Sequence, residues 1–301
     1  MTDISQETLA AVGTTAAPVS KTRSRQIWKR LRRVIAYVGI VWVILVFVFP
    51  LWVALDTSVK PVNQQRTFPT SLLSTRPTLE KYAKAFGPLN FPHYMGNTVL
   101  VAGVTTLLAV SVGSLAGYAL SRFRFRGHTF FSRTILLMYM FPPMLLLIPL
   151  YMLLTSLKIR DSLWALIVCD TTFALPFAIW MLKSFFDTVP RELDEAALID
   201  GCSLLGALLR VVLPVSVPGV IATAVFSFML AWGEYLFAVT LITTQGYQPI
   251  SVAVYALMQP FALDPGMLMA VSVISAVPPI IFFFLAQKWI VQGLTAGAVK
   301  G

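Results

Sequence analysis

The stretch that decides the fold is Glu195-Ala196-Ala197-Leu198-Ile199-Asp200-Gly201, followed after nine residues by Val211-Val212-Leu213-Pro214. Acidic residues near its start and the two alanines favour a helix, because negative charge stabilises a helix N-terminus and alanine is the best helix former. Pro190 suits the beginning of that helix, and Gly201 suits a left-handed residue that ends it. The segment therefore predicts a short, water-exposed, kinked helix between long apolar stretches, placed where a soluble partner could bind.

The composition is that of a membrane protein. Apolar residues make up 57% of the 301 residues and charged residues 12%, whereas soluble domains carry about 25% charged residues. Several apolar stretches are long enough to cross about 30 Å of hydrocarbon as helices. We expect an all-α integral membrane domain over residues 31–301, preceded by a disordered basic tail at 1–30. The expected spans lie at about 34–55, 94–120, 133–155, 163–183, 214–243 and 266–288, and the loop 184–213 joins the fourth span to the fifth.

The distribution of Lys and Arg predicts the orientation. With six spans, both termini fall on one side, together with the loop 184–213. That side carries sixteen Lys and Arg residues and the opposite side carries seven. Positive residues are retained on the cytoplasmic side, so both termini and the loop are predicted to be cytoplasmic. The net charge of +10 then reflects topology and contact with anionic lipid, and no nucleic-acid partner is expected.

Motifs for catalysis and metal binding are missing from the sequence. It has no glycine-rich phosphate loop ending in Gly-Lys-Ser/Thr and no Gly-x-Ser-x-Gly elbow. Its two histidines, His93 and His128, are predicted on opposite sides of the membrane, so they cannot share a metal. We therefore expect no catalytic residue, no metal site and no cofactor in this chain. Two alternatives stay open on the residues alone: a stand-alone proton- or sodium-coupled carrier and an integral-membrane enzyme. Six spans without a visible inverted repeat disfavour the carrier.

The spacing of the segment resembles a known family signature. Glu-Ala-Ala, three residues, Gly, nine residues and aliphatic-x-Leu-Pro is similar to the cytoplasmic loop of ABC-importer permease subunits. The similarity extends over roughly 31–301 and is strongest to the second permease of carbohydrate importers, the maltose-permease type. Further matching pieces are Ser58–Pro61, Asn97-Thr98, Leu175–Trp180 and the tail Gly293–Gly301. One departure is Gly233, where the family pattern has Asn.

The resemblance implies a fold, a function and partners. The fold would be a type I ABC-importer permease with six transmembrane helices and a cytoplasmic coupling helix. The chain would be the permease subunit of an ATP-driven, binding-protein-dependent sugar importer in a bacterial inner membrane, working by alternating access. Its partners would be a second permease, two cytoplasmic ATPase subunits that use ATP and Mg²⁺, and an extracytoplasmic solute-binding protein. The residues implied in coupling to the ATPases are Leu193, Glu195, Ala196, Ala197, Leu198, Gly201, Leu213 and Pro214.

Two acidic residues, Asp170 and Glu234, fall inside the expected spans. A charge at the bilayer centre costs about 2.5–3.5 kcal/mol on insertion scales, so such groups usually face a bundle interior or an aqueous path. One interpretation places them on the substrate path with Thr171, Trp180, Trp232 and Tyr235, whose polar groups and flat rings suit a sugar. The alternative is that they are hydrogen-bond partners between helices, worth about 0.6–1 kcal/mol each. In the carrier hypothesis, either carboxyl group would be the ion site.

Small residues recur at four-residue spacing in the second expected span. Ala109, Gly113 and Gly117 would form one stripe on that helix, since residues four apart share a face. Such a stripe allows two helices to approach closely. We expect it to pack against another helix of the bundle or against a partner permease.

Overall fold

The computed structural model describes residues 21–65, 73–258 and 264–298, with side chains omitted at 21–27, 29 and 290–298. Within these ranges every regular element is a helix. The chain divides into two compact units, residues 1–53 and 54–301. Helix α1 (Lys21–Val59) runs from the first unit into the second. Of the predicted tail, residues 1–20 lie outside the described residues, and residues 21–30 begin α1.

The second unit contains the remaining helices. Its α-helices are α2 (Val62–Gln65), α3 (Glu80–Phe86), α4 (Phe91–Arg122), α5 (His128–Tyr139), α6 (Leu147–Ser156), α7 (Leu163–Phe186), α8 (Arg191–Ile199), α9 (Leu204–Ala207), α10 (Leu213–Val215), α11 (Val217–Trp232), α12 (Leu236–Leu241), α13 (Ile250–Ala256) and α14 (Pro265–Ala298). Short 3₁₀ turns lie at Pro143–Leu146 and Gln245–Tyr247, and a π-helical turn lies at Leu208–Val212.

Four helical stretches are long and apolar enough to cross a membrane singly: Arg30–Val59, Phe91–Arg122, Leu163–Phe186 and Pro265–Trp289. Two bent pairs bring the number to six if each pair is one span. His128–Tyr139 meets Pro143–Ser156 at 95°, and Leu204–Val215 meets Val217–Trp232 at 85°. The third and fifth spans expected from the sequence, 133–155 and 214–243, are therefore not straight helices. Proline explains the first bend, because Pro142 and Pro143 lack the N–H that would continue the helix.

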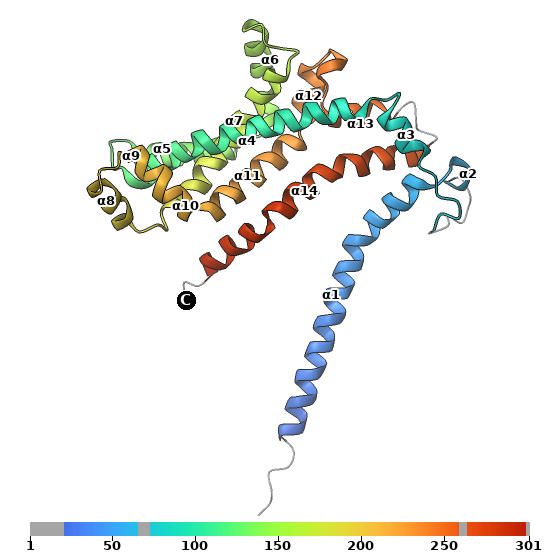
Figure 1. Cartoon of the computed structure of the whole chain (residues 1–301), viewed down its shortest axis with the longest axis horizontal. Helices are drawn as coiled ribbons and strands as arrows, with labels where there is room; N and C mark the ends of the chain where they lie inside the picture. Colours follow the sequence, from blue (N-terminus) through green and yellow to red (C-terminus); the bar gives the residue numbers. More distant parts are fainter. Residues whose placement is uncertain (1–20, 66–72, 259–263, 299–301) are drawn as a thin grey trace, which may run out of the picture. The chain divides into compact units, whose positions relative to one another are not determined.

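The second unit is a bundle in which α4, α7, α11 and α14 run side by side (Figure 1). Helices α4 and α7 form the most extensive of these pairs. The predicted small-residue stripe lies in this interface. Ala109 packs with Ala174 and Ala178, and a Cβ added to Gly113 would lie 3.0 Å from the Ala178 Cβ. The prediction of close packing is confirmed, and the neighbour is within the bundle.

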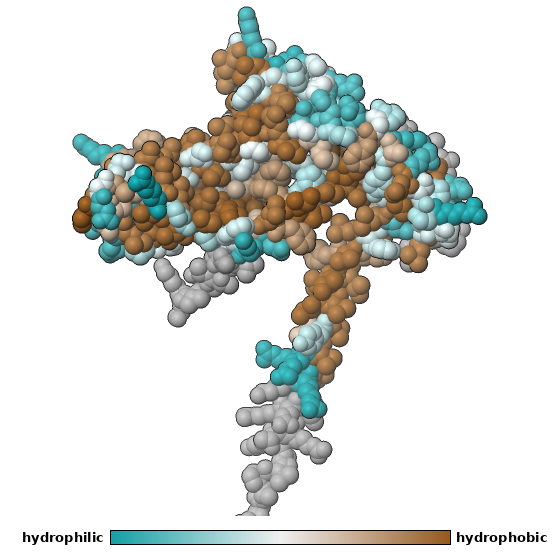
Figure 2. All heavy atoms as spheres, viewed as in Figure 1, coloured by the Kyte–Doolittle hydropathy of each residue, from teal (hydrophilic) through white to brown (hydrophobic). Residues whose placement is uncertain are grey.

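The ends of the bundle differ from its middle. In Figure 1, α8 and α9 lie at the end where α4 finishes, while α3 and α13 lie at the other end. Apolar residues cover most of the visible face between the two ends, and hydrophilic residues gather at the ends themselves (Figure 2). This distribution suits a protein whose middle contacts lipid, because charged groups are costly in hydrocarbon.

Candidate functional site

The helix predicted around Glu195 is α8, and its end is a Schellman motif. Gly201 has a φ of 83°, in the left-handed region that glycine adopts without strain. The Cys202 amide donates to the Ala197 carbonyl at 2.9 Å, and the Gly201 amide donates to the Leu198 carbonyl at 3.1 Å. These two bonds satisfy carbonyls at the helix end and turn the chain sharply. The predicted helix and its glycine stop are confirmed, with Pro190 immediately before the first helical residue, Arg191.

Asp194 anchors α8 to the end of α4. Asp194 as a whole is only 7% exposed. One carboxylate oxygen accepts a 2.8 Å hydrogen bond from the Tyr118 hydroxyl, and the other pairs with Arg122 Nε at 2.8 Å. The Arg122 and Asp194 side chains are 8% and 10% exposed. Removing one partner from such a pair leaves an uncompensated buried charge, so the three side chains fix the position of α8 on the bundle.

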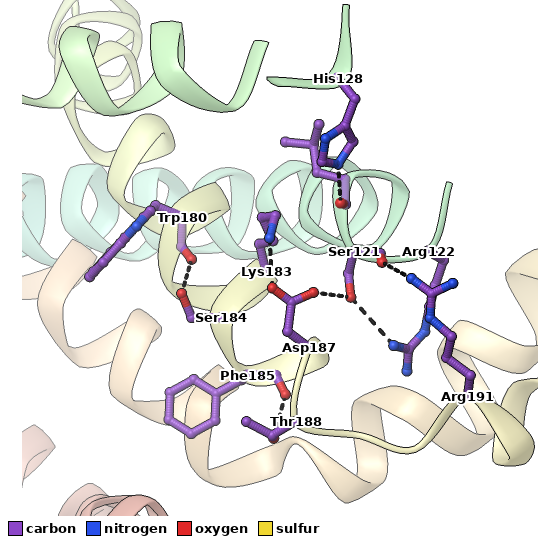
Figure 3. A network of polar contacts seen from close by, with 11 residues as sticks. Ser121, Arg122, His128, Trp180, Lys183, Ser184, Phe185, Asp187, Thr188 and Arg191 are labelled. Carbon is purple, nitrogen blue, oxygen red and sulfur yellow. Dashed lines mark hydrogen bonds and ion pairs between the residues drawn. The ribbon is translucent and has the colours of Figure 1, made fainter. Parts of the chain in front are cut away.

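A second set of bonds holds the chain that leads into α8. Arg122 Nη2 donates to the Val189 carbonyl at 3.0 Å, and Arg191 Nη2 donates to the Ser121 carbonyl at 3.1 Å. The Ser121 hydroxyl donates to Asp187 at 2.7 Å, and Lys183 pairs with the same carboxylate at 2.6 Å (Figure 3). The segment between α7 and α8 is thus tied to α4 at several points.

The opposite face of α8 is left uncovered within the described chain. Leu193 is 40% exposed, Leu198 41% and Ile199 86%. The exposed surface continues over Leu204, Leu205 and Leu209, and Glu195 and Ala196 are exposed beside it. We call these eight residues the loop face. Of the other predicted coupling residues, Ala197 is buried, Leu213 is half-buried, and Gly201 and Pro214 are exposed.

The six residues predicted for a substrate path occupy different surroundings. Asp170 is 1% exposed on α7, and its Oδ1 has no hydrogen-bond partner among the described residues. Glu234 lies at a break between α11 and α12, where its carboxylate accepts the amides of Phe237 and Ala238 at 2.7 and 2.9 Å. It therefore caps α12, while remaining close enough to Asp170 for an electrostatic interaction.

The aromatic residues of that set do not gather at one place. Trp232 is 9% exposed in a packed cluster, with its ring 5.5 Å from that of Phe228. Tyr235 lies beside Tyr255, with ring centroids 5.2 Å apart. Trp180 is 44% exposed and ten residues beyond Asp170 on α7, or about 15 Å along the helix axis. Thr171 lines a mostly apolar pocket with Leu108, Trp164, Ile167, Val168, Thr172 and Leu175.

At the other end of the bundle, the loop after α12 is held by polar contacts. Asp161 accepts the amides of Thr243 and Thr244 at 2.7 and 2.9 Å and the Thr244 hydroxyl at 2.6 Å. These hydrogen bonds favour the ionised carboxylate and hold the pKa of Asp161 well below its usual range. Asn97 on α4 donates to the Gly246 and Gln248 carbonyls at 3.0 and 2.9 Å. This loop therefore has a defined conformation next to α4.

The chain is similar to known proteins along most of its length. Residues 109–296 match the model of the family described as the binding-protein-dependent transport system inner membrane component. The chain belongs to this family. This permease is 38% identical over 275 residues to the inner membrane ABC transporter permease protein YcjP of Escherichia coli, covering 91% of this chain and 98% of that one. It is 35% identical to the trehalose/maltose transport system permease protein MalG of Thermococcus litoralis, covering 90% and 98%.

The fold agrees with that of solved importers. The permease aligns with a bacterial ABC transporter involved in the import of the polysaccharide alginate, with a TM-score of 0.73 and 19% identity, covering 91% of this chain and all of that one. The predicted all-helical ABC-importer permease fold is confirmed. Because the family consists of membrane components of binding-protein-dependent systems, the permease is a transport subunit and not an enzyme. The alternatives of a stand-alone carrier and a membrane enzyme are set aside.

Sequence reasoning missed the residues that hold α8 in place. Tyr118 and Arg122 lie at the end of α4, 76 and 72 positions before Asp194, so local spacing could not pair them with it. A weak signal exists in hindsight. Asp194 falls three residues before Ala197, the other buried residue of α8, and a charge on the buried side of a short amphipathic helix requires a partner.

Proposed function

We propose that this permease imports a carbohydrate with a second permease, two cytoplasmic ATPase subunits and an extracytoplasmic solute-binding protein. ATP and Mg²⁺ would be bound by the ATPase subunits. The carbohydrate class is supported by relatives named for trehalose and maltose, sulfoquinovosyl glycerol, trehalose, and diacetylchitobiose transport. These names belong to proteins 30–35% identical to this chain, so the sugar taken by this permease is a matter for direct measurement.

The observation that carries the coupling mechanism is the contrast between the two faces of α8. One face is fixed to α4 through Asp194, Tyr118 and Arg122. The other is the loop face, an exposed apolar surface next to a helix end. A soluble ATPase that gripped this face would move α8, and the buried ion pair would transmit that movement to α4 without loss of contact. The bundle would then alternate between its inward-open and outward-open forms.

The two carboxyl groups support a substrate path through the second unit. Asp170 is buried on α7, and Glu234 is half-buried at the α11–α12 break, within electrostatic range of Asp170. We place Asp170, Thr171, Glu234 and Tyr235 at or near the path. Trp180 and Trp232 lie away from this group, so their predicted role there has weaker support.

A charge placed on the loop face tests the coupling role. Leu198→Glu should prevent co-purification of the ATPase subunits and abolish ATP-dependent uptake in proteoliposomes, because a buried unpaired carboxylate opposes docking. Gly201→Asp should do the same by straining the left-handed turn. Both variants should insert into the membrane normally. Glu192→Gln, an exposed change on the same helix, is the matched control. Full uptake by Leu198→Glu would refute a coupling role for this surface.

A further inference from the structure

A cavity of about 360 Å³ lies between the end of α4, α5 from His128 to Leu136 and the second half of α7. It belongs neither to the loop face nor to the group around Asp170. Its polar residues lie nearer the helix ends, and its apolar residues lie further along the helices. The residues on which the argument depends are Arg124, His128, Ser132, Arg133, Trp180 and Lys183.

The charge in this cavity is all of one sign. Among the described residues that line it, three are Lys or Arg, one is His, and none is acidic. Lys183 is paired with Asp187, which lies outside the cavity lining. Arg124 and Arg133 form no ion pair with another described residue. Two guanidinium groups therefore face this space without a counter-charge, and guanidinium binds phosphate oxygens through two parallel hydrogen bonds.

Neutral donors lie next to the same space. Ser132 belongs to the cavity lining, and its Oγ, buried in the wall, has no hydrogen-bond partner among the described residues. A buried hydroxyl without a partner is costly, so it marks a place where a further acceptor is expected. The cavity also adjoins the start of α5, whose N-cap, Gly127, offers no side chain to the first amides. Helix N-termini attract anions, and this one adds to the guanidinium groups.

The lining changes from polar to apolar along the helices. Arg124, His128 and Lys183 lie toward the helix ends, next to a second, polar cavity of about 660 Å³ that shares these three residues. Leu136 and Ile179 lie deeper, and Trp180 is exposed at the same level. His128 and Leu136 are eight residues apart on α5, or about 12 Å along its axis. A free phosphate would occupy only the polar end of such a site.

We propose that this cavity binds an anionic glycerophospholipid from the adjacent leaflet. Its phosphodiester would lie between Arg124 and Arg133 and accept a hydrogen bond from the Ser132 hydroxyl once that side chain rotates toward the cavity. Its acyl chains would lie along Leu136, Ile179 and Trp180 and continue over Leu137 and Met140, which are 66% and 72% exposed. Basic pockets between transmembrane helices are typical sites for anionic lipid headgroups, and a tryptophan at the membrane interface is typical of that depth.

The site would be connected to α8. Lys183 at its rim pairs with Asp187, Asp187 accepts from Ser121, and the Ser121 carbonyl accepts from Arg191, the first residue of α8 (Figure 3). A lipid phosphate near Lys183 would compete with Asp187 for the ammonium group. A bound headgroup would therefore alter the contacts that hold the start of α8.

Native mass spectrometry of the delipidated full-length chain tests the proposal with three probes. These are dioleoylphosphatidylglycerol, dioleoylphosphatidylcholine and inorganic phosphate. The wild-type chain should retain phosphatidylglycerol about tenfold more strongly than phosphatidylcholine, because two cationic side chains favour the net negative lipid. Arg124→Gln combined with Arg133→Gln should remove most of that preference. Both side chains are exposed, so the double variant should fold. Arg126→Gln combined with Lys158→Gln removes the same charge outside the cavity and should keep the preference.

Three outcomes would overturn the assignment. One is equal retention of the two lipids by the wild-type chain. Another is an unchanged preference in the Arg124 and Arg133 double variant, or an equal loss in the control. The third is complete displacement of phosphatidylglycerol by millimolar inorganic phosphate, which would assign the cavity to a soluble phosphate ester. As an independent check, Ser132→Ala should weaken phosphatidylglycerol retention severalfold without lowering the Tm, since it deletes only an unpaired hydroxyl.

Discussion

At the scale of single residues, Asp194 links α8 to the end of α4. The pattern of residues 190–201 predicted where α8 begins and ends, because proline, acidic residues, alanine and glycine each act on the nearest turn of helix. It did not predict that Asp194 points inward, because the partners Tyr118 and Arg122 are distant in sequence. Local chemistry can be inferred from local sequence, whereas a buried ion pair between distant elements depends on the packed fold.

Removing the carboxylate should therefore have a large effect. Asp194→Ala leaves Arg122 buried without its counter-charge, which costs about 3–5 kcal/mol in comparable pairs. Tyr118→Phe removes one hydrogen bond to a charged group and should cost less, about 1.5–3 kcal/mol. Thermal unfolding of the purified chain in detergent would rank the Tm values as wild type, Tyr118→Phe and then Asp194→Ala. Glu192→Gln serves as the exposed control. If Glu192→Gln lowered the Tm as much as Asp194→Ala does, the argument from the buried ion pair would be wrong.

At the scale of elements, the sequence predicted where the long membrane-spanning helices lie but not where the spans bend. Long apolar stretches indicated α4, α7 and α14 directly, since length and composition alone decide whether a helix can cross a bilayer. The bends did not follow from composition. Pro142 and Pro143 end a helix, yet Pro176 lies inside α7 and Pro278 and Pro279 lie inside α14. Whether proline breaks or only perturbs a span depends on which neighbours satisfy the released carbonyl groups.

The small-residue stripe predicted that α4 packs closely against a neighbour but did not identify it. The structure shows that the neighbour is α7, and the contact can be tested with two glycines on α4. A Cβ on Gly117 would lie 3.0 Å from the Lys183 amide nitrogen and 3.2 Å from the Ile179 carbonyl oxygen. These are backbone atoms, so α7 itself would have to shift. Gly117→Ala should destabilise the fold by about 1–3 kcal/mol through overpacking. Gly103→Ala should not, because no atom lies within 4 Å of its Cβ position. Equal Tm values for the two variants would argue against close helix contact.

At the scale of the whole molecule, charge counting predicts the orientation, and family membership gives the transport role. The sequence predicts that the loop face and both termini lie on the side richer in Lys and Arg, and that the loop after α12, with Tyr247, lies on the opposite side. The structure supplies exposed reporters on both sides: Ile199 is 86% exposed and Tyr247 46% exposed. Cys169 is fully buried, so replacing Cys202 alone should give a protein that does not react with the labelling reagent.

Cysteine labelling would test this orientation in a Cys202→Ser background. Ile199→Cys should react with a membrane-impermeant maleimide in inside-out vesicles, washed with urea to strip peripheral subunits, and should stay unlabelled in spheroplasts. Tyr247→Cys should show the reverse, because positive residues are retained inside and its loop lies on the less basic side. Each variant is the control for the other, since both sites are exposed and are predicted on opposite sides of the membrane. Labelling of Ile199→Cys from outside would place the loop face where no cytoplasmic ATPase could reach it, and the coupling mechanism would then be wrong.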